Sequence, residues 1–424
     1  MDIEIMAVGT ELLLGQIANT NAQYISRRLP EAGANVYFHS VVGDNPARLR
    51  DCLDIAFARC DTVITTGGLG PTEDDLTKET LAAYFHRELL LDEPVLEQIR
   101  DFFKKRNRPM PNHVAKQARM PAGSRMIPNS RGTAPGCIIE EGGRTAIILP
   151  GPPSEMIPMF EDTVMPYLVS RSPWRIVSRF IKFFGIGESL VEERLLDLVD
   201  AQKNPTLATY VKEGEVILRI TARCDRQGNP EALLDPVLWE VKARLGDYIY
   251  DTDGRSMEEV LSERLRKAGR TLSLAESCTG GLLGASLTEW PGASDFFLAD
   301  AVCYSNKAKT VLLGVSPEIL EKYGAVSEET AVAMAEGIRC RTGSDYGLSV
   351  TGIAGPGGGT EGKPVGTVCI ALAEGGTTRA NTYRLAGDRT RIRNLARLHA
   401  FDMLLRRLSD PEGDGTPGPE RIRA

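Results

Sequence analysis

The stretch GRTLSLAESCTGGLLGASLTEW, residues 269–290, decides the fold of the C-terminal part of this 424-residue chain. Residues 269–273 predict a β-strand, and the apolar spacing of residues 282–290 predicts a helix. The polar and glycine-rich residues between them form a strand-to-helix turn. Such a connection is expected in an α/β sheet.

Ser277 lies in this turn, where its hydroxyl can act as a nucleophile. The first N–H groups of a helix have no partner inside the helix, so they can bind a phosphate or a developing oxyanion at such a turn. Two other interpretations stay open. Serine is a preferred N-cap residue, and Cys278 is a rival nucleophile because a helix N-terminus activates a thiolate.

Tyr304 and Lys307 follow the strand predicted at residues 296–303 and open another helix. A lysine desolvated beside a tyrosine can lose its proton near neutral pH and accept one from a serine. Taken alone, Lys307 is also typical of a solvated first-turn lysine. A third turn, residues 350–360, is so rich in glycine that it indicates a ligand close to its backbone. The three turns together predict a catalytic site.

The N-terminal part alternates strands and helices. Strands are predicted at residues 3–8, 35–42 and 62–65, and helices at residues 22–29 and 46–58. This alternation predicts a parallel sheet covered by helices. Ligands of open α/β sheets lie over the carboxyl ends of the strands, so a site is expected there.

Carboxylates gather beside a glycine turn in this part. Gly67-Gly68-Leu69-Gly70 is suited to bind phosphate, and Glu73, Asp74 and Asp75 follow directly, with Glu11 in another strand-end turn. Since these anions would repel a diphosphate, a divalent metal between them is predicted. The alternative is that the acids only favour the positive end of a helix beginning near Leu76.

Residues 174–253 predict an α+β region without catalytic groups, with strands at 176–184 and 215–223 and helices at 189–200 and 231–245. The turn Gly185-Ile186-Gly187-Glu188 distantly resembles the nucleic-acid-binding KH loop. Its acidic surroundings favour a spacer or dimerisation role instead. The tail, residues 409–424, is rich in Pro, Gly and charge and is expected to be disordered.

Composition narrows the class of protein. The length indicates two or three domains, and 42% hydrophobic residues suffice for their cores. No apolar run reaches the ~18 residues of a membrane helix, and no targeting segment is apparent, so a cytoplasmic location is expected. The net charge of −7 argues against direct nucleic-acid binding. The eight cysteines and four histidines are scattered, which predicts reduced thiols and no zinc site.

Residues 256–408 resemble the nicotinamide-nucleotide amidase (NMN deamidase) domain of the CinA family, with motif blocks at 275–281, 304–307 and 351–356. The resemblance implies Ser277 as nucleophile, Tyr304 and Lys307 as its activating partners, and no cofactor. The implied substrate-binding residues are Thr279, Gly280, Gly281, Thr351, Gly352, Gly355 and Arg391.

Residues 1–170 resemble the molybdopterin-binding-like domain at the N-terminus of CinA proteins, with blocks at 9–21, 66–77, 129–136 and 149–156. This resemblance implies an ADP-ribose pyrophosphatase that needs a divalent metal (Mg, Mn, Co or Ni) and potassium. The implied metal ligands are Asp74 and Asp75. The implied nucleotide- and phosphate-binding residues are Thr10, Glu11, Asn19, Asn21, Gly67, Gly68, Gly70, Asn129, Gly132 and Thr133.

The fold class predicted is α/β: a three-layer molybdopterin-binding-like domain with a parallel sheet (1–170), a small α+β, KH-like connecting domain (171–255), an α/β amidase domain (256–408) and the tail. The function predicted is hydrolysis of nicotinamide mononucleotide to nicotinate mononucleotide and ammonia, with ADP-ribose hydrolysis at the second site, in pyridine nucleotide salvage by a homodimer. Two alternatives stay open: an N-terminal domain that only senses a pterin or nucleotide, and a competence or DNA-damage partner protein.

Overall fold

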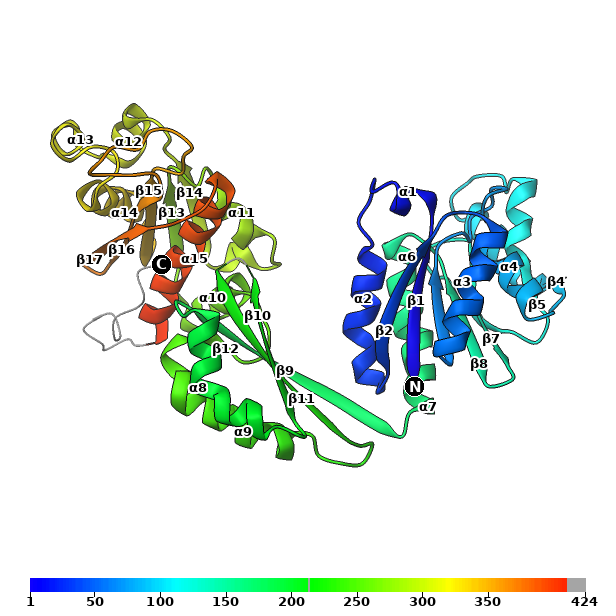
Figure 1. Cartoon of the computed structure of the whole chain (residues 1–424). Coiled ribbons are helices and arrows are strands. Elements are labelled where there is room, and N and C mark those ends of the chain that lie inside the picture. Colours follow the sequence, from blue (N-terminus) through cyan, green and yellow to red (C-terminus); the bar gives the residue numbers. More distant parts are fainter. Residues whose placement is uncertain (213, 410–424) are drawn as a thin grey trace. The chain divides into compact units, whose positions relative to one another are not determined.

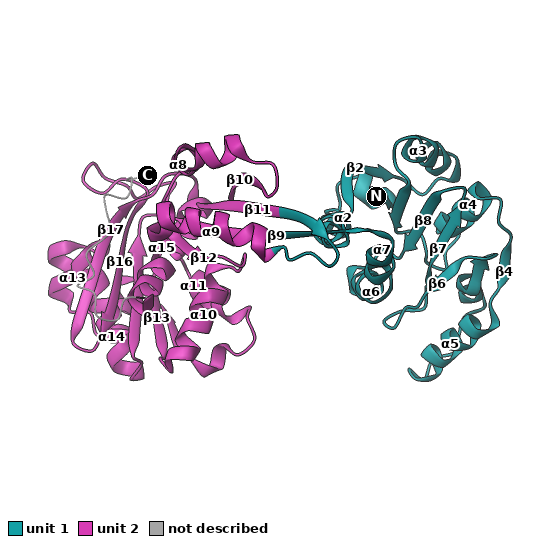
Figure 2. Ribbon diagram, turned by 90° about the horizontal axis from the view of Figure 1, so that it is seen from below, with its two compact units in different colours: residues 1–177, 222–230 teal, residues 178–221, 231–424 magenta. Residues whose placement is uncertain are grey.

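A computed structural model describes residues 1–212 and 214–409, which fold into two compact units. The first contains residues 1–177 and 222–230, and the second contains the described residues of 178–221 and 231–424 (Figure 2). No helix in the described ranges is long and apolar enough to cross a membrane. The predicted disorder of the tail concerns residues that, apart from Ser409, lie outside the described ones.

The N-terminal sheet has the strand order β2-β1-β3-β8-β7-β6. Figure 1 labels β1, β2, β7 and β8 of this sheet. Its strands are β1 (Asp2–Val8), β2 (Asn35–Val42), β3 (Thr62–Thr66), β6 (Arg125–Ile127), β7 (Gly136–Glu141) and β8 (Arg144–Leu149). The first four in sheet order are parallel, as predicted, whereas β7 is reversed and pairs antiparallel with both β8 and β6. The reversal comes from the two-residue loop Gly142-Gly143, whose positive φ angles suit a tight hairpin.

Helices cover both faces of this sheet. Ile3 and Ile5 pack against α2 (Thr20–Arg28), α6 (Pro153–Met159) and α7 (Met165–Arg171). Met6 and Val8 point to the opposite face, where α3 (Pro46–Arg59) and α4 (Thr77–Tyr84) lie. Strand β1 is therefore buried on both faces, as expected of a parallel strand covered by helices. The remaining elements are α1 (Thr10–Leu13), β4 (Leu89–Leu91), α5 (Glu93–Lys104) and β5 (Arg119–Pro121).

The middle region forms a four-stranded sheet with the order β10-β11-β9-β12. Its elements are β9 (Trp174–Phe184), α8 (Glu188–Ala201), β10 (Thr206–Lys212), β11 (Glu215–Asp225), α9 (Glu231–Leu245) and β12 (Ile249–Asp251). The predicted strands and helices are all present. Strand β10 was not predicted; it pairs antiparallel with β11 along its whole length.

The C-terminal sheet has the order β14-β13-β15-β16-β17. Its strands are β13 (Leu272–Glu276), β14 (Phe297–Val302), β15 (Tyr346–Gly352), β16 (Thr367–Glu374) and β17 (Thr377–Arg384). Its helices are α10 (Met257–Ala268), α11 (Leu282–Thr288), α12 (Asn306–Leu313), α13 (Pro317–Tyr323), α14 (Glu328–Thr342) and α15 (Arg389–Ser409). Strand β13 lies parallel between β14 and β15.

The strand predicted at residues 269–273 begins later, at Leu272. Gly269 instead ends α10 in a left-handed conformation, with a φ of 60°. Glycine is favoured at this helix-ending position because it lacks the Cβ that would clash. The strand therefore runs directly into Ser277.

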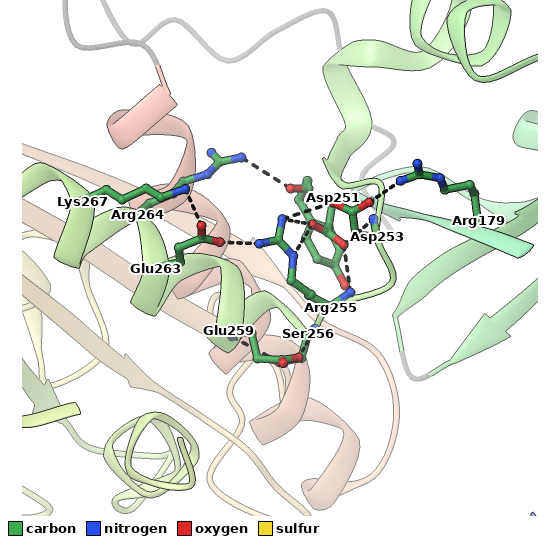
Figure 3. A network of polar contacts seen from close by, with 10 residues as sticks. Arg179, Asp251, Asp253, Arg255, Ser256, Glu259, Glu263, Arg264 and Lys267 are labelled. Atoms are coloured by element: carbon green, nitrogen blue, oxygen red, sulfur yellow. Dashed lines mark hydrogen bonds and ion pairs between the residues drawn. The ribbon is translucent and has the colours of Figure 1, made fainter. Parts of the chain in front are cut away.

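The middle region packs on the C-terminal region through polar and apolar contacts. Asp251 is buried and accepts hydrogen bonds from the Arg255 guanidinium (Figure 3). Arg255 also pairs with Glu263 of α10. Phe184 of β9 and Tyr250 of β12 belong to the same apolar cluster as the C-terminal core. These contacts fix the start of α10, whose N-cap Ser256 forms a capping box.

Candidate active site

Ser277 and a buried lysine form a hydrogen-bonded pair at the carboxyl end of β13. The backbone N–H of Ser277 donates to the Val350 carbonyl at 3.0 Å, which anchors the turn to β15. The Lys309 Nζ lies 2.9 Å from the Ser277 Oγ and also donates to the Cys303 carbonyl at 2.8 Å. Lys309 is only 1% exposed, and burial lowers the pKa of its amine. Only a neutral amine can accept the serine proton. Because its pKa is lowered, Lys309 is neutral more often than a solvated lysine at the same pH.

The lysine beside the serine is thus Lys309, and the prediction of Lys307 was wrong on this contact. Lys307 is exposed. Two residues apart on a helix point about 200° away from each other, so only one of them can face the core. Lys309 shares the buried face of α12 with Leu313, four residues later. That i, i+4 relation to an apolar residue is the sequence signal that could have identified it.

Tyr304 lies at the site's surface rather than against Ser277. Its side chain is exposed, and its hydroxyl accepts a hydrogen bond from Arg389 Nη2 at 3.0 Å. Arg389 Nη1 donates to the Gly355 carbonyl at 2.7 Å. Arg389 therefore links two of the predicted turns, a role that sequence reasoning did not assign.

The arginine side chains at the start of α15 point in different directions. Arg393 donates through Nε and Nη2 to the Thr279 carbonyl, at 3.1 and 2.6 Å. Arg391 is exposed, and its side chain lies beside Gly387, so no contact seen in the described residues joins it to the turns. Arg389 and Arg393 are four residues apart and share a helix face that Arg391 does not. Arg389 and Arg393 therefore contact the turns, and the assignment of Arg391 to the substrate stays a prediction.

The amides of Gly280 and Gly281 are already used inside the turn. Gly280 N–H donates to the Ser277 carbonyl at 3.1 Å, and Gly281 N–H donates to Glu276 Oε2 at 2.9 Å. The expectation that these two amides meet the substrate is therefore not supported. The amides of Cys278 and Thr279, which directly follow the serine, are the nearer candidates for an oxyanion.

The predicted contacts after β15 have structural roles. The Thr351 hydroxyl is buried and donates to the Ala325 carbonyl at 2.7 Å, so it does not face a substrate. A Cβ at Gly352 would lie 2.8 Å from the Thr367 carbonyl oxygen, so this glycine permits close pairing with β16.

Cys278 is a poor rival nucleophile. It is 6% exposed, and burial raises the pKa of its thiol to about 12. A thiol in apolar surroundings stays protonated near neutral pH and does not attack.

Several predicted N-terminal residues lie where β1, β3 and β8 end. A Cβ at Gly67 would overlap the Val8 carbonyl oxygen, so the two strand ends lie in contact there. The Thr10 amide and hydroxyl both donate to Asp44 Oδ2 at 2.9 Å. Asn21 Nδ2 donates to the Gly151 carbonyl at 2.7 Å. These turns line the edge of the sheet where the strand order reverses, the usual place of a ligand crevice.

The other predicted residues of this edge differ in their hydrogen-bond partners and in their exposure. Asn129 Oδ1 accepts from the Gly132 amide at 2.7 Å, and Asn129 Nδ2 donates to Glu155. Asn19 caps α2 by accepting from the Ala22 amide. Glu11 is exposed, Thr133 is half-buried, and Gly68 accepts from the Thr77 amide.

The carboxylates do not converge on a metal. Asp75 Oδ2 accepts from the Thr72 amide at 3.0 Å and from the Thr72 hydroxyl. Asp74 is exposed, and hydrogen bonding to Thr72 lowers its pKa. Within residues 1–212 and 214–409, no three His, Cys, Asp or Glu side chains could hold a metal ion. Asp74 and Asp75 by themselves do not fit a metal site, and the metal requirement stays a prediction.

A small depression lies beside this turn, lined by Gly68, Leu69, Gly70, Asp75, Lys78, Glu79, Lys116 and Gln117. Lys116 Nζ donates to the Asp75 carbonyl at 2.6 Å. Lys78 is 4% exposed and donates to the Gln117 carbonyl at 2.7 Å, and burial lowers the pKa of its amine. These two cations were not predicted.

Comparison with known proteins covers nearly the whole described chain. Three family models match: "Probable molybdopterin binding domain" (residues 4–170), "Damage-inducible protein CinA KH domain" (residues 178–250) and "CinA C-terminal domain" (residues 254–408). CinA-like proteins of Dictyoglomus thermophilum and Dictyoglomus turgidum are 54% and 52% identical over 408 residues, covering 96% of this chain and 99% of each relative. A crystal structure of a CinA superfamily protein from Enterobacter cloacae is 38% identical over 36% of this chain and 90% of that chain, with a TM-score of 0.35.

The three matches follow the order of the regions that the sequence predicted, and they include a KH domain in the middle, which the glycine turn had suggested only distantly. The relatives match at about half identity along almost their full length. The chain therefore belongs to the CinA family.

Proposed function

We propose that the C-terminal domain hydrolyses the carboxamide of nicotinamide mononucleotide to nicotinate mononucleotide and ammonia. The observation that carries this proposal is the contact of Ser277 Oγ with the buried Lys309 Nζ, 2.9 Å apart at a strand-to-helix turn. A serine next to a desolvated lysine has the base that nucleophilic acyl transfer requires.

The steps follow from this pair. Ser277 Oγ attacks the amide carbon while Lys309 accepts its proton, and the Cys278 and Thr279 amides stabilise the oxyanion of the tetrahedral intermediate. Collapse breaks the carbon–nitrogen bond, and Lys309 returns the proton to the leaving ammonia. Water, deprotonated by the same amine, then hydrolyses the acyl-enzyme and regenerates Ser277.

We assign substrate binding to the residues around the Ser277–Lys309 pair. Arg389 and Arg393 bring two guanidinium groups to the turns at Gly355 and Thr279. Guanidinium groups bind phosphate through charge-assisted hydrogen bonds, so they suit the phosphate of a mononucleotide. Tyr304, held by Arg389, would border the same space.

A second activity, hydrolysis of ADP-ribose, is proposed for the N-terminal domain. It is favoured by the depression next to Gly68–Gly70, where the amines of Lys78 and Lys116 line a phosphate-compatible turn. Tight nucleotide or pterin binding without turnover would favour a sensor instead.

Product analysis of the purified chain tests both activities. Nicotinamide mononucleotide should release ammonia with or without a chelator, and ADP-ribose should be cleaved only with divalent metal. Ser277→Ala should abolish ammonia release alone, because the second site lies in another domain. Ammonia release by Ser277→Ala at the wild-type rate would exclude the proposed nucleophile.

A further inference from the structure

Two acids lie side by side behind the nucleophile turn. Glu276 ends β13 directly before Ser277 and is fully buried, and Asp300 lies on the neighbouring strand β14. In the parallel register Leu274 pairs with Asp300 and Glu276 with Val302, which puts the two acids on one face of the sheet. Asp300 Oδ1 has no hydrogen-bond partner among the described residues.

Glu276 holds the turn that follows β13. Its Oε2 accepts from the Gly281 amide and its Oε1 from the Gly284 amide, both at 2.9 Å, so each oxygen faces an N–H donor. Burial, and next the charge of Glu276, raises the pKa of the neighbouring Asp300 to about 8.

The fold makes room for this arrangement. A Cβ at Gly284 would overlap the Asp300 carboxyl group, so a side chain here would push α11 away from the two acids. The glycine lets the first turn of α11 approach closely enough for its amides to reach Glu276.

From these contacts we propose that Glu276 is a positioning residue for Ser277, holding the turn that follows the serine through the Gly281 and Gly284 amides. The proposal rests on Ser277 being the nucleophile, as proposed above. It assigns no contact with the substrate to either acid.

Two nearly isosteric variants separate these roles. Asp300→Asn changes the neighbouring acid but neither amide contact of Glu276, so the turn should stay in place. Glu276→Gln replaces one acceptor with an NH2 group, which leaves the Gly281 or Gly284 amide buried without a partner. A displaced nucleophile lowers the rate of reaction more than it weakens binding.

The test uses the full chain with nicotinamide mononucleotide. Glu276→Gln should lower kcat by about tenfold or more, as expected when a buried donor loses its partner, whereas KM should change by less than about twofold. Asp300→Asn should keep kcat within about threefold of the wild type. Unchanged kcat in Glu276→Gln, or an equal loss in Asp300→Asn, would overturn the proposal.

Two further measurements keep the outcome independent of the substrate and of folding. The rate at which a fluorophosphonate probe labels Ser277, with Ser277→Ala as blank, should be lower in Glu276→Gln than in Asp300→Asn and the wild type. Deuterium exchange of the peptide spanning 277–284 should rise in Glu276→Gln alone. Should wild-type protein label but not hydrolyse the mononucleotide, the proposed substrate fails while the positioning role is still decided. Should Glu276→Gln not fold, Gly284→Ala replaces it, because the added Cβ would overlap the Asp300 carboxyl group and move the Gly284 amide from Glu276. Gly284→Ala should then be labelled more slowly than the wild type, and an unchanged labelling rate would refute the role.

Discussion

Replacing Lys309 by methionine tests the central contact of the site. Methionine fills a similar volume in the buried position but cannot take the proton of Ser277, 2.9 Å away. Loss of a general base costs about 10²–10⁴-fold in rate, or about 3–5 kcal/mol in activation free energy. We therefore expect kcat to fall by this factor, with a much smaller change in KM.

The same substitution should not destabilise the protein. Burial lowers the pKa of Lys309, so the folded chain binds its proton less tightly than the unfolded chain does. As the pH falls below the ordinary lysine pKa, charging this amine therefore costs folding free energy, and the wild type loses stability that the variant keeps. The melting temperature of Lys309→Met relative to wild type should rise as the pH is lowered.

The matched control is Lys307→Met on the same helix. Lys307 is exposed, so its loss should leave kcat within about twofold, as is usual for a surface substitution. Ammonia release by a coupled assay, with thermal melts at several pH values, checks both variants. A strong loss in Lys307→Met with near-normal kcat in Lys309→Met would refute the assignment of the base.

The remaining predictions concern binding, the rival nucleophile and the N-terminal site. Arg389→Ala should raise KM for nicotinamide mononucleotide by about tenfold, as expected for one lost charge-assisted phosphate contact, whereas Arg391→Ala should leave KM unchanged; the reverse order in steady-state kinetics would restore Arg391. Cys278→Ala should retain turnover, because its thiol is protonated, and an inactive but folded Cys278→Ala would contradict this. Asp75→Asn should cost only about 1 kcal/mol of stability in a thermal melt, because Asp75 holds Thr72, and should leave ADP-ribose cleavage and ammonia release in place; loss of ADP-ribose cleavage at unchanged stability would restore Asp75 as a metal ligand.

Local sequence signals predicted most of the elements. The strand at residues 35–42 and the helix at 231–245 match the structure at both ends. Strand periodicity, helix spacing and glycine position are properties of neighbouring residues, so they can be read without the fold. The antiparallel β7 and β6 were not foreseen, because pairing between distant strands is settled only when the whole sheet forms.

The sequence by itself placed Ser277 at a strand-to-helix turn, because the turn, the strand before it and the helix after it are consecutive in the chain. Only the tertiary structure selected Lys309 over Lys307 and brought Glu276 and Asp300 to one face of neighbouring strands. A residue's type fixes its chemistry, but its direction depends on how its helix or strand is rotated against the core. That rotation is set by packing contacts from remote parts of the chain, which local sequence patterns do not contain.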